Sequence, residues 1–165
     1  MRKLTLLFLA TVFSIVGANA QRVFGYFPDE YRSENTIQYG SVTDIGYSFA
    51  NPSTTGALIT TYVSKEFSLD MTKFQQVKAN CITNGVNLWL VVGGADDFER
   101  RAARLTTVCE SGTKRAKFVA DLVAFGETHN LKGFVIDWEF PKTNAERAAH
   151  EELLKDLKAE IASSS

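Results

Sequence analysis

Four short apolar runs alternate with stretches of helical periodicity along this chain, and that alternation limits the fold more than any other feature. We expect strands at residues 23–27, 42–50 and 86–92 and in the stretch 131–141. Strands separated by helices of this length form βαβ units, in which the strands are parallel and the crossovers right-handed. The fold class is therefore α/β, as an open doubly wound sheet or as part of a (β/α)8 TIM barrel.

The helical stretches carry their own start and stop signals. Helices are expected at about residues 68–85, 113–129 and 143–161. Ser68 or Asp70 can cap the first, and Gly85 stands where a helix often ends in a left-handed residue. Thr143 and Glu146 have the spacing of a capping box, which predicts the start of the last helix.

The first twenty residues have the features of a secretory signal peptide. A basic start precedes an apolar stretch over residues 4–16, and Ala18-Asn19-Ala20 is a small-residue cleavage site. The apolar stretch is shorter than the ~20 residues that a membrane-spanning helix needs. We therefore expect residues 1–20 to be removed, and residues 21–165 to be secreted as one domain without membrane contact.

The composition argues against several kinds of partner and cofactor. Two of the eighteen Lys and Arg residues lie in the first twenty residues, so sixteen remain against nineteen Asp and Glu residues, a net charge of −3. No basic face stands out, so we expect no nucleic-acid partner. Cys81 and Cys109 are candidates for one disulfide in an oxidising compartment, whereas two isolated cysteines make a poor metal site. We expect neither a metal nor another cofactor.

The stretch LKGFVIDWEFP, residues 131–141, ends an apolar run in two carboxylates, Asp137 and Glu139. Alternate residues of a strand share a face, so both acids point to one side at the carboxyl end, where α/β folds place their chemistry. They stand ~7 Å apart along the strand. Mutual repulsion and burial would raise the pKa of one of them, so that this carboxyl stays protonated near neutral pH and can act as a general acid. Such a pair suits glycoside cleavage. On position alone, two solvated acids at a strand end are the alternative.

Four motifs resemble, in order, the first four strands of glycoside hydrolase family 18, the chitinases and chitinase-like proteins. They are VFGYFP, DIGYSFA, LWLVVGG and GFVIDWEFP. The resemblance implies that Glu139 is the general acid/base and that Asp137 holds the substrate's N-acetyl group, which itself attacks the sugar carbon. It also implies that Tyr26 and Phe49 shape the sugar-binding floor. Trp89 is expected in the core but could reach the same cavity, so it is a further candidate for substrate binding.

The chain departs from the family signature, which runs Asp-x-x-Asp-x-Asp-x-Glu, at its first two positions. Lys132 and Val135 stand where the signature has Asp, and Val91 replaces the serine of the third strand. In the family, the second Asp and that serine are polar neighbours of the next Asp. A buried carboxyl without such partners is harder to ionise. We therefore expect Asp137 to hold its proton more tightly and any hydrolysis to be slow.

A closed (β/α)8 barrel takes ~250 residues, whereas the alternation in this chain accounts for about four βα units. We expect a half barrel whose exposed sheet edges can self-associate, or a fragment of a longer product. The leading function is hydrolysis of β-1,4-linked N-acetylglucosamine polymers such as chitin. The alternatives are a chitooligosaccharide-binding lectin, an assembly module, or an inactive truncated fragment.

Three remaining features are expected to be structural. Gly93-Gly94 is expected to form a tight turn, because no phosphate-binding pattern follows it. His129 and His150 are expected at the surface near helix ends. The cluster Glu99-Arg100-Arg101 is expected on the solvated start of a helix.

Overall fold

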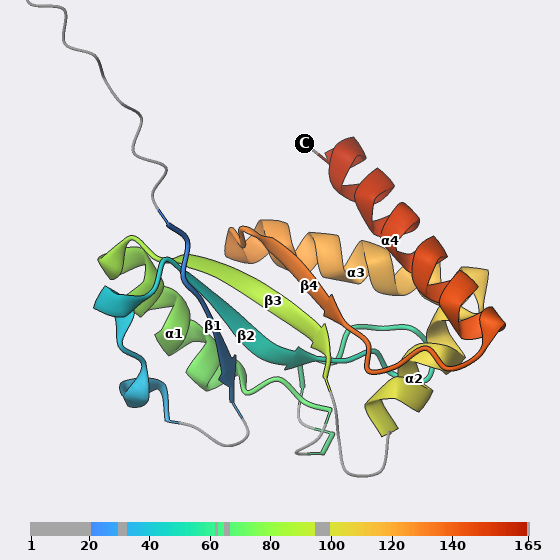
Figure 1. The fold of residues 1–165 in the computed structure, drawn as a ribbon, viewed down its shortest axis with the longest axis horizontal. Helices are drawn as coiled ribbons and strands as arrows, with labels where there is room; N and C mark the ends of the chain where they lie inside the picture. Colours follow the sequence, from blue (N-terminus) through green and yellow to red (C-terminus); the bar gives the residue numbers. More distant parts are fainter. Residues whose placement is uncertain (1–20, 30–32, 62, 65–66, 95–99, 165) are drawn as a thin grey trace, which may run out of the picture.

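The computed structural model describes residues 21–29, 33–61, 63–64, 67–94 and 100–164, so the expected signal peptide lies outside the described residues. Strands and helices alternate through these residues (Figure 1). The strands are β1 (Phe24–Pro28), β2 (Asp44–Ala50), β3 (Asn87–Gly93) and β4 (Gly133–Asp137). The α-helices are α1 (Met71–Asn84), α2 (Arg100–Cys109), α3 (Gly112–His129) and α4 (Asn144–Ser164), and two 3-10 turns, η1 (Glu34–Thr36) and η2 (Tyr39–Ser41), follow β1.

The four strands form one parallel sheet in the order β1-β2-β3-β4. A doubly wound sheet reverses its strand order at a switch point, and this sheet has no such reversal. Neighbours in sequence are neighbours in space throughout, as in the successive βα units of a TIM barrel. The fold is therefore α/β and has the architecture of a partial TIM barrel, as the sequence predicted.

The two faces of the sheet differ in burial because alternate residues point to opposite sides. One face, which we call the outer face, packs against the helices and carries fully buried Tyr47, Leu90 and Val92. The other face, the inner face, carries the exposed rings of Phe24 and Tyr26. The main core thus lies between the sheet and its helices, and the inner face would line the interior of a closed barrel.

The predicted helix signals are confirmed. Asp70 caps α1 by accepting a hydrogen bond of 3.0 Å from the Lys73 N–H, and Gly85 ends the helix with φ 65°. Before α4, Glu146 accepts from the Thr143 N–H at 2.8 Å and the Glu146 N–H donates to the Thr143 hydroxyl at 3.1 Å. These reciprocal bonds form the expected capping box. Among the helices of the described segments, none is long and apolar enough to cross a membrane.

The candidate disulfide is absent, because Cys81 and Cys109 are both free thiols. They lie on separate helices, α1 and α2, and each faces the core. Burial favours the neutral thiol, raising the pKa of Cys81 to about 11 and that of Cys109 to about 12. The two residues therefore behave as small apolar side chains.

The two histidines, expected at the surface, are half-buried. His129 packs its ring against Phe74 and Phe125, with centroids 5.0 and 4.3 Å away. His150 lies edge-on to Trp138 at 5.7 Å, with its Nε2 buried. Both rings extend the aromatic packing of the core.

Candidate active site

Asp137 is the last residue of β4 and lies beside the glycine pair that ends β3. The Gly94 N–H donates to the Asp137 carbonyl at 2.7 Å. Gly93 and Gly94 have φ of 101° and 78°, a region that disfavours side chains. A Cβ on Gly93 would stand 2.6 Å from the Asp137 carbonyl oxygen. The glycine pair therefore makes the predicted tight turn and lets β3 approach the carboxyl end of β4.

Asp137 and Glu139 meet at this end of the sheet, as the strand alternation predicted. The pKa of Asp137 is raised, chiefly because the half-buried carboxyl is desolvated, and a hydrogen bond with the Glu139 side chain opposes part of that rise. The surroundings of Asp137 thus disfavour its carboxylate form. The sequence predicted this direction from the missing polar partners.

Two valines occupy the inner face beneath Asp137. Val135 precedes Asp137 by two residues on β4 and pairs in register with Val91 on β3. Val91 is fully buried and in turn pairs with Ser48 on β2. The two departures from the family signature are therefore neighbours, and neither side chain can hydrogen-bond the Asp137 carboxyl. This confirms the prediction of a paired change from polar to apolar beneath the acids.

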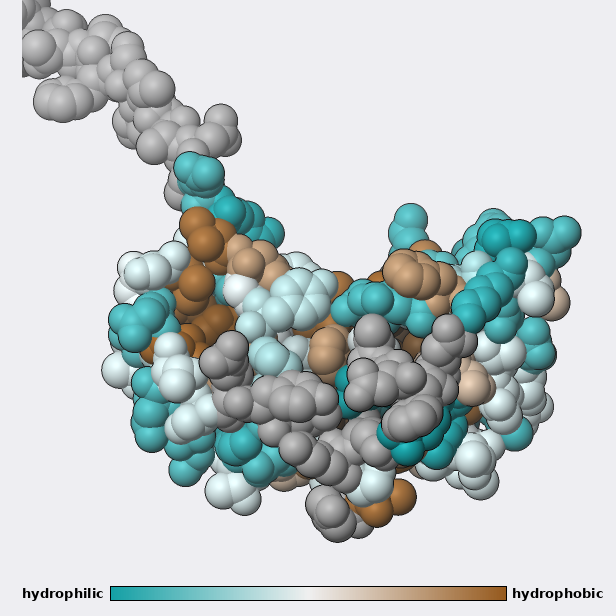
Figure 2. Space-filling view, turned by 60° about the horizontal axis from the view of Figure 1, so that its bottom comes forward, coloured by the Kyte–Doolittle hydropathy of each residue, from teal (hydrophilic) through white to brown (hydrophobic). Residues whose placement is uncertain are grey.

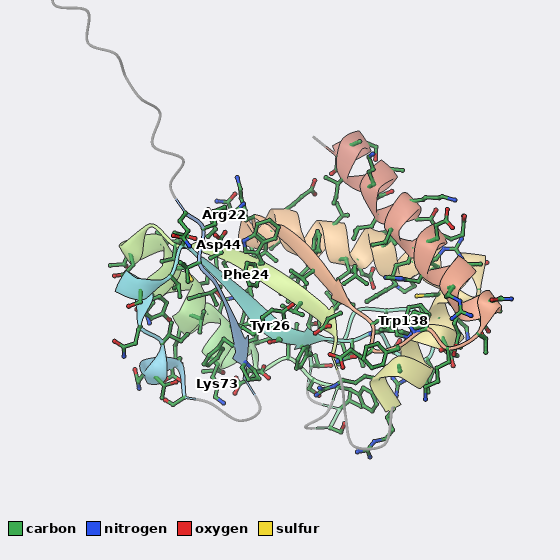
Figure 3. The ribbon with its side chains drawn as sticks, viewed as in Figure 1. Arg22, Phe24, Tyr26, Asp44, Lys73 and Trp138 are labelled. Atoms are coloured by element: carbon green, nitrogen blue, oxygen red, sulfur yellow. The ribbon has the colours of Figure 1, made fainter. Side chains whose placement is uncertain are left out.

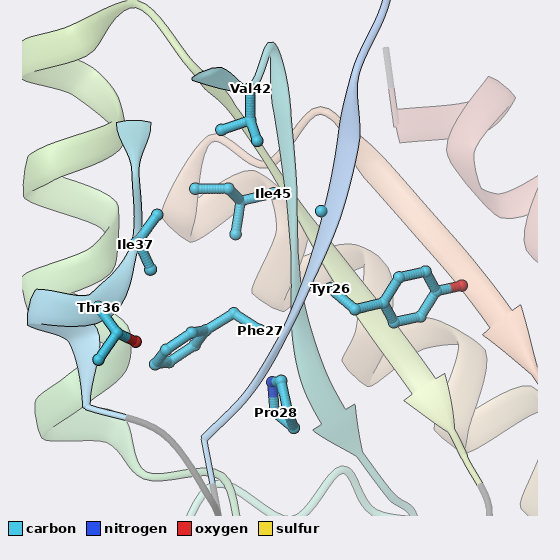
Figure 4. Close-up of a pocket in the computed structure, with 8 residues that line it drawn as sticks. Tyr26, Phe27, Pro28, Thr36, Ile37, Val42 and Ile45 are labelled. Atoms are coloured by element: carbon cyan, nitrogen blue, oxygen red, sulfur yellow. The ribbon is translucent and has the colours of Figure 1, made fainter. Parts of the chain in front are cut away.

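Tyr26 lies on β1, at the far edge of the sheet from the two acids, in the same row as Trp89 and Gly133. Its ring projects from β1 across the inner face, on the opposite side of the strand from Phe27 and Ile45 (Figure 4). Burial raises the pKa of its phenol, and the negative charges of Asp137 and Glu139 raise it further. Tyr26 is 52% exposed, so the face that it presents is open to a ligand. Tyr26 thus lies on the inner face within the electrostatic influence of both acids.

Phe49 is the next-to-last residue of β2 and lies against Gly94, which follows β3. Its ring occupies the position that a Cβ on Gly94 would need. On its other side, the Arg101 guanidinium of α2 lies 4.9 Å from the ring centroid. A cation at this distance from a ring is attracted to its π face. Phe49 is therefore held beside the turn that contacts Asp137, as expected of a floor residue.

Arg101 is a site residue that the sequence did not identify, since it was expected on a solvated helix start together with Glu99, which lies outside the described residues. It is only 2% exposed, and burial lowers its pKa while the charge of Asp29 opposes that effect. Asp29 is itself buried and accepts a hydrogen bond of 2.8 Å from the Asp70 N–H. The sequence signal was weak: two arginines at the start of a helix do not show which one points inward.

Trp89 lies at the opposite end of the sheet from the acids. It pairs with Gly133, four residues before Asp137 and so ~13 Å away along the strand. Its indole N–H donates to the buried carboxylate of Asp44 at 2.8 Å. The Arg22 guanidinium lies over its ring, 5.5 Å from the centroid. Figure 3 shows Arg22 and Asp44 close together at this end of the sheet. This hydrogen bond holds the indole beside Asp44, on the inner face and in the same row as Tyr26, so a contact of Trp89 with substrate stays a prediction.

Asp44 is the centre of that structural cluster. It accepts hydrogen bonds from Arg22 Nε at 3.0 Å, Thr43 Oγ1 at 2.7 Å and Asn87 Nδ2 at 3.0 Å, in addition to Trp89. These donors, Arg22 above all, hold the pKa of Asp44 far below its usual value. The cluster ties β1, β2 and β3 together at the end of the sheet remote from Asp137.

A metal centre finds no support in the geometry. Within the described ranges, no three His, Cys, Asp or Glu side chains are placed to hold a metal ion. The groups at the carboxyl end of the sheet are two carboxyls, a phenol and an aromatic floor. This set can donate and accept a proton and can present flat apolar surface to a sugar ring.

Comparison with known proteins agrees with this arrangement. The sequence profile of the glycosyl hydrolases family 18 matches residues 22–165. The chain belongs to this family. No curated protein matches the family 18 chain by sequence.

Solved structures with the same fold include both chitinases and a lectin-like relative. A chitinase from Rhizomucor miehei is 20% identical, with a TM-score of 0.70 over 86% of this chain and 44% of its own. A chitinase-like agglutinin from Robinia pseudoacacia is 21% identical, with a TM-score of 0.70 over 86% of this chain and 41% of its own. A class V chitinase mutant from Nicotiana tobaccum in complex with NAG4 is 19% identical, with a TM-score of 0.72 over 86% of this chain and 39% of its own.

The chain thus spans less than half the length of each of these three structures. The likeness establishes a shared fold, in a family whose members include active chitinases and an agglutinin. Which of these two activities the present chain has must be argued from its own site.

Proposed function

We propose that this family 18 chain is a secreted, slow glycoside hydrolase of β-1,4-linked N-acetylglucosamine polymers. The observation that carries the proposal is the pair of acids at the carboxyl end of β4, where the Asp137 and Glu139 side chains are hydrogen-bonded. Active sites of TIM barrels occupy this end. The substrate class follows from the family and from the NAG4 complex of one structural neighbour.

In the proposed reaction, the protein supplies a proton and an orienting carboxyl, and the substrate supplies the nucleophile. Glu139 donates its proton to the glycosidic oxygen, and the leaving sugar departs with that proton. The acetamido oxygen of the retained sugar bonds to the anomeric carbon, while Asp137 orients the acetamido N–H. Water then attacks the same carbon, the bond from that carbon to the acetamido oxygen breaks and restores the acetamido group, and the water gives a proton to Glu139, which restores the acid.

Slow turnover follows from the surroundings of Asp137. The acetamido group gains positive charge as it attacks, so an ionised Asp137 stabilises that step and a protonated one does not. Desolvation raises the pKa of Asp137, and Val91 and Val135 offer no hydrogen bond that would lower it. At a given acidic pH, the fraction of the protein with a neutral Asp137 is therefore larger than it would be for an aspartate of ordinary pKa.

The same observation favours a second function, the binding of chitooligosaccharide without cleavage. If Asp137 is protonated and stabilises the attack of the acetamido group poorly, cleavage is impaired, but Tyr26 and Phe49 can still contact a sugar. The chitinase-like agglutinin among the structural neighbours has the same fold. Retention of Glu139 is the reason to place hydrolysis first.

The deciding experiment measures reducing-end release from chitotetraose by the wild-type protein and by Glu139→Gln. Removing a general acid costs about 10²–10⁴-fold in rate, so hydrolysis should fall by at least about 100-fold while affinity for chitotetraose changes little. Glu110→Gln is the matched control, because Glu110 is an exposed glutamate at the end of α2 and should leave both unchanged. Saturable binding without hydrolysis in the wild type would select the lectin instead. A wild-type protein that neither binds nor hydrolyses chitotetraose would refute both functions.

Secretion is proposed on the leader-like residues 1–20. Expression of the full coding sequence in a eukaryotic secretory host should release a protein whose amino-terminal residue is Gln21. An intact amino terminus on the secreted protein would contradict the cleavage site.

A further inference from the structure

The pairing of the strands does not fix the side chain of Phe49. Ser48 pairs in register with Val91. The next pair is Ala50 with Val92, so Phe49 is an extra residue on β2 that has no partner on β3. A residue inserted in this way forms a β-bulge, which re-aims its side chain and is common next to active sites. The place of the Phe49 ring therefore depends on what the side chain contacts.

Phe24 on β1 offers a contrast. It pairs in register with Asp44, so the strand pairing sets the side of the sheet on which its ring lies. Hydrophobic surface is visible beside the start of β1 in Figure 2, where Phe24 is 39% exposed. An exposed ring can thus keep its side of the sheet through strand pairing, whereas the bulged ring of Phe49 needs contacts of its own.

The first contact of the Phe49 ring is the backbone of Gly94. A Cβ on Gly94 would stand 2.4, 2.5 and 2.6 Å from three successive carbons of the ring. Distances this nearly equal put the Cβ position over the face of the ring and not at its edge, and one α-proton of Gly94 points there. The Gly94 N–H in turn donates to the Asp137 carbonyl at 2.7 Å. The ring is therefore separated from the backbone of Asp137 by one glycine.

The second contact is the guanidinium of Arg101, in the first turn of α2. Its central carbon lies 4.9 Å from the centroid of the Phe49 ring. Arg101 is only 2% exposed, so little water screens this cation–π attraction, which is stronger at a desolvated site than at the surface. The guanidinium therefore opposes any movement of the ring away from its present place.

Asp29, which follows β1, stabilises the charge of Arg101 at this buried position. Asp29 is itself buried, and its negative charge opposes the fall in the Arg101 pKa that burial causes. The Asp29 carboxyl accepts a hydrogen bond of 2.8 Å from the Asp70 N–H, and the Lys73 ammonium donates to the Asp29 carbonyl. The surroundings of Arg101 are thus fixed by the end of β1 and the start of α1 as well as by its own helix.

We propose that Arg101 is a positioning residue of the site. Its guanidinium holds the bulged Phe49 ring over Gly94, which keeps the exposed part of the ring in place as a floor for one N-acetylglucosamine unit beside Asp137. Because Arg101 is buried, it acts on the sugar only through Phe49. The identity of the ligand rests on the proposed function, whereas the position of the ring does not.

Calorimetric titration of the full chain with chitotetraose tests the effect on binding. Arg101→Met should weaken binding by about 5- to 30-fold, the range that a partly to fully desolvated cation–π interaction gives. Arg101→Lys keeps the cation and should restore most of the affinity. In hydrolysis the loss should appear in KM with kcat nearly unchanged, because a floor binds substrate and transition state alike.

A double-variant cycle separates action through the ring from a general structural role. Phe49→Leu should weaken binding about as much as Arg101→Met, and adding Arg101→Met to Phe49→Leu should cause no further loss. Losses that add up in the double variant would contradict the proposal, because Arg101 would then act independently of the ring.

Arg104→Met is the matched control on the same helix. Arg104 lies 4.3 Å from the centroid of the Phe67 ring and donates to the Pro52 carbonyl at 3.1 Å. Its replacement removes a comparable cation–π contact and should leave chitotetraose binding unchanged. A loss as large as that in Arg101→Met would count against the proposal, because loosening of α2 would then explain both.

The NMR signal of Gly94 tests the position of the ring without any sugar. In the wild type, the ring current of Phe49 should move one α-proton signal of Gly94 upfield, because that proton lies over the ring. The signal should return towards the ordinary glycine value in Arg101→Met, as in Phe49→Leu, and should stay in place in Arg104→Met. Circular dichroism checks folding, and Arg101→Gln, which is polar but uncharged, replaces Arg101→Met with the same expectations if the latter does not fold.

The two experiments distinguish failure of this inference from failure of the proposed function. A wild type that does not bind chitotetraose refutes the proposed function and, with it, the role of Phe49 as a sugar-binding floor. An unchanged Gly94 signal in folded Arg101→Met overturns the positioning role of Arg101 alone, whatever the wild type binds.

Discussion

The substitution Val135→Asp tests the account of the site most directly. Val135 lies on the inner face two residues before Asp137, at ~7 Å along the strand, and pairs with Val91. A carboxyl at this position can share one proton with Asp137 through a charge-assisted hydrogen bond. The two groups then titrate as a coupled pair, whose first proton is lost at lower pH than from a lone desolvated carboxyl.

The size of the expected gain follows from that hydrogen bond. A hydrogen bond to a charged group contributes about 1.5–3 kcal/mol. Each ~1.4 kcal/mol of transition-state stabilisation changes the rate about tenfold, so kcat should rise by about 10- to 100-fold. Replacing the apolar side chain of Val135, which is only partly buried, lowers the free energy of unfolding by about 1 kcal/mol, too little to unfold a typical domain.

The pH dependence supplies a second readout with a definite sign. The pKa of Asp137 is raised in the wild type, so the ionised form, and with it the rate, declines as the pH falls through that raised value. In Val135→Asp the acid limb of the rate profile should move to lower pH. The assay is reducing-end release from chitotetraose across pH 3–8, about the range in which carboxyl pairs titrate.

The control is Val135→Asn, which has nearly the same shape and can hydrogen-bond but cannot share a proton. It should give a smaller gain and leave the limb of the profile in place. An unchanged rate and an unchanged acid limb in folded Val135→Asp would refute the reasoning, because the apolar floor would then have no effect on Asp137.

Two further predictions concern stability and thiol chemistry. Asp44→Asn should lower the free energy of unfolding at pH 7 by about 3 kcal/mol, since it weakens charge-assisted bonds from Arg22 and Trp89 at a buried site. Because the folded pKa of Asp44 is depressed, its contribution is complete above the unfolded pKa of about 4 and declines below it, so wild type and variant should converge towards pH 2 in urea titrations. Cys81 and Cys109 should both react with iodoacetamide in denaturant without prior reduction, and a mass gain of two alkyl groups checks this. If neither cysteine is alkylated before reduction and both are alkylated after it, the two cysteines form a disulfide and the prediction of free thiols is wrong.

Much of the fold could be predicted from local patterns. The strand and helix alternation, the Asp70 cap, the Gly85 stop and the capping box before α4 all appear where they were predicted. Each depends on residues within a few positions of one another, where backbone propensity and side-chain hydrogen bonds act. The exception is α2, for which only a start was expected, and its apolar residues are few.

Part of the site was also accessible from sequence. Strand alternation put Asp137 and Glu139 on one side, and the motif comparison paired Val135 with Val91 and placed Tyr26 nearby. The sequence could not show that desolvation is the main cause of the raised Asp137 pKa, because desolvation depends on how the surrounding strands and loops exclude water. It also missed the burial of Arg101 against Phe49 and the hydrogen bond from Trp89 to Asp44, because those partners lie more than forty residues away in sequence.

By itself, the sequence determined the α/β alternation, the helix boundaries and the position of two carboxyls at the end of β4. These features follow from periodicities of two and about 3.6 residues and from short-range capping. Only the tertiary structure decided that desolvation is the main cause of the raised Asp137 pKa, that Trp89 donates a hydrogen bond to Asp44, and that both thiols are buried apart. Those outcomes depend on burial and on contacts between distant segments, which arise when the sheet and its helices pack together.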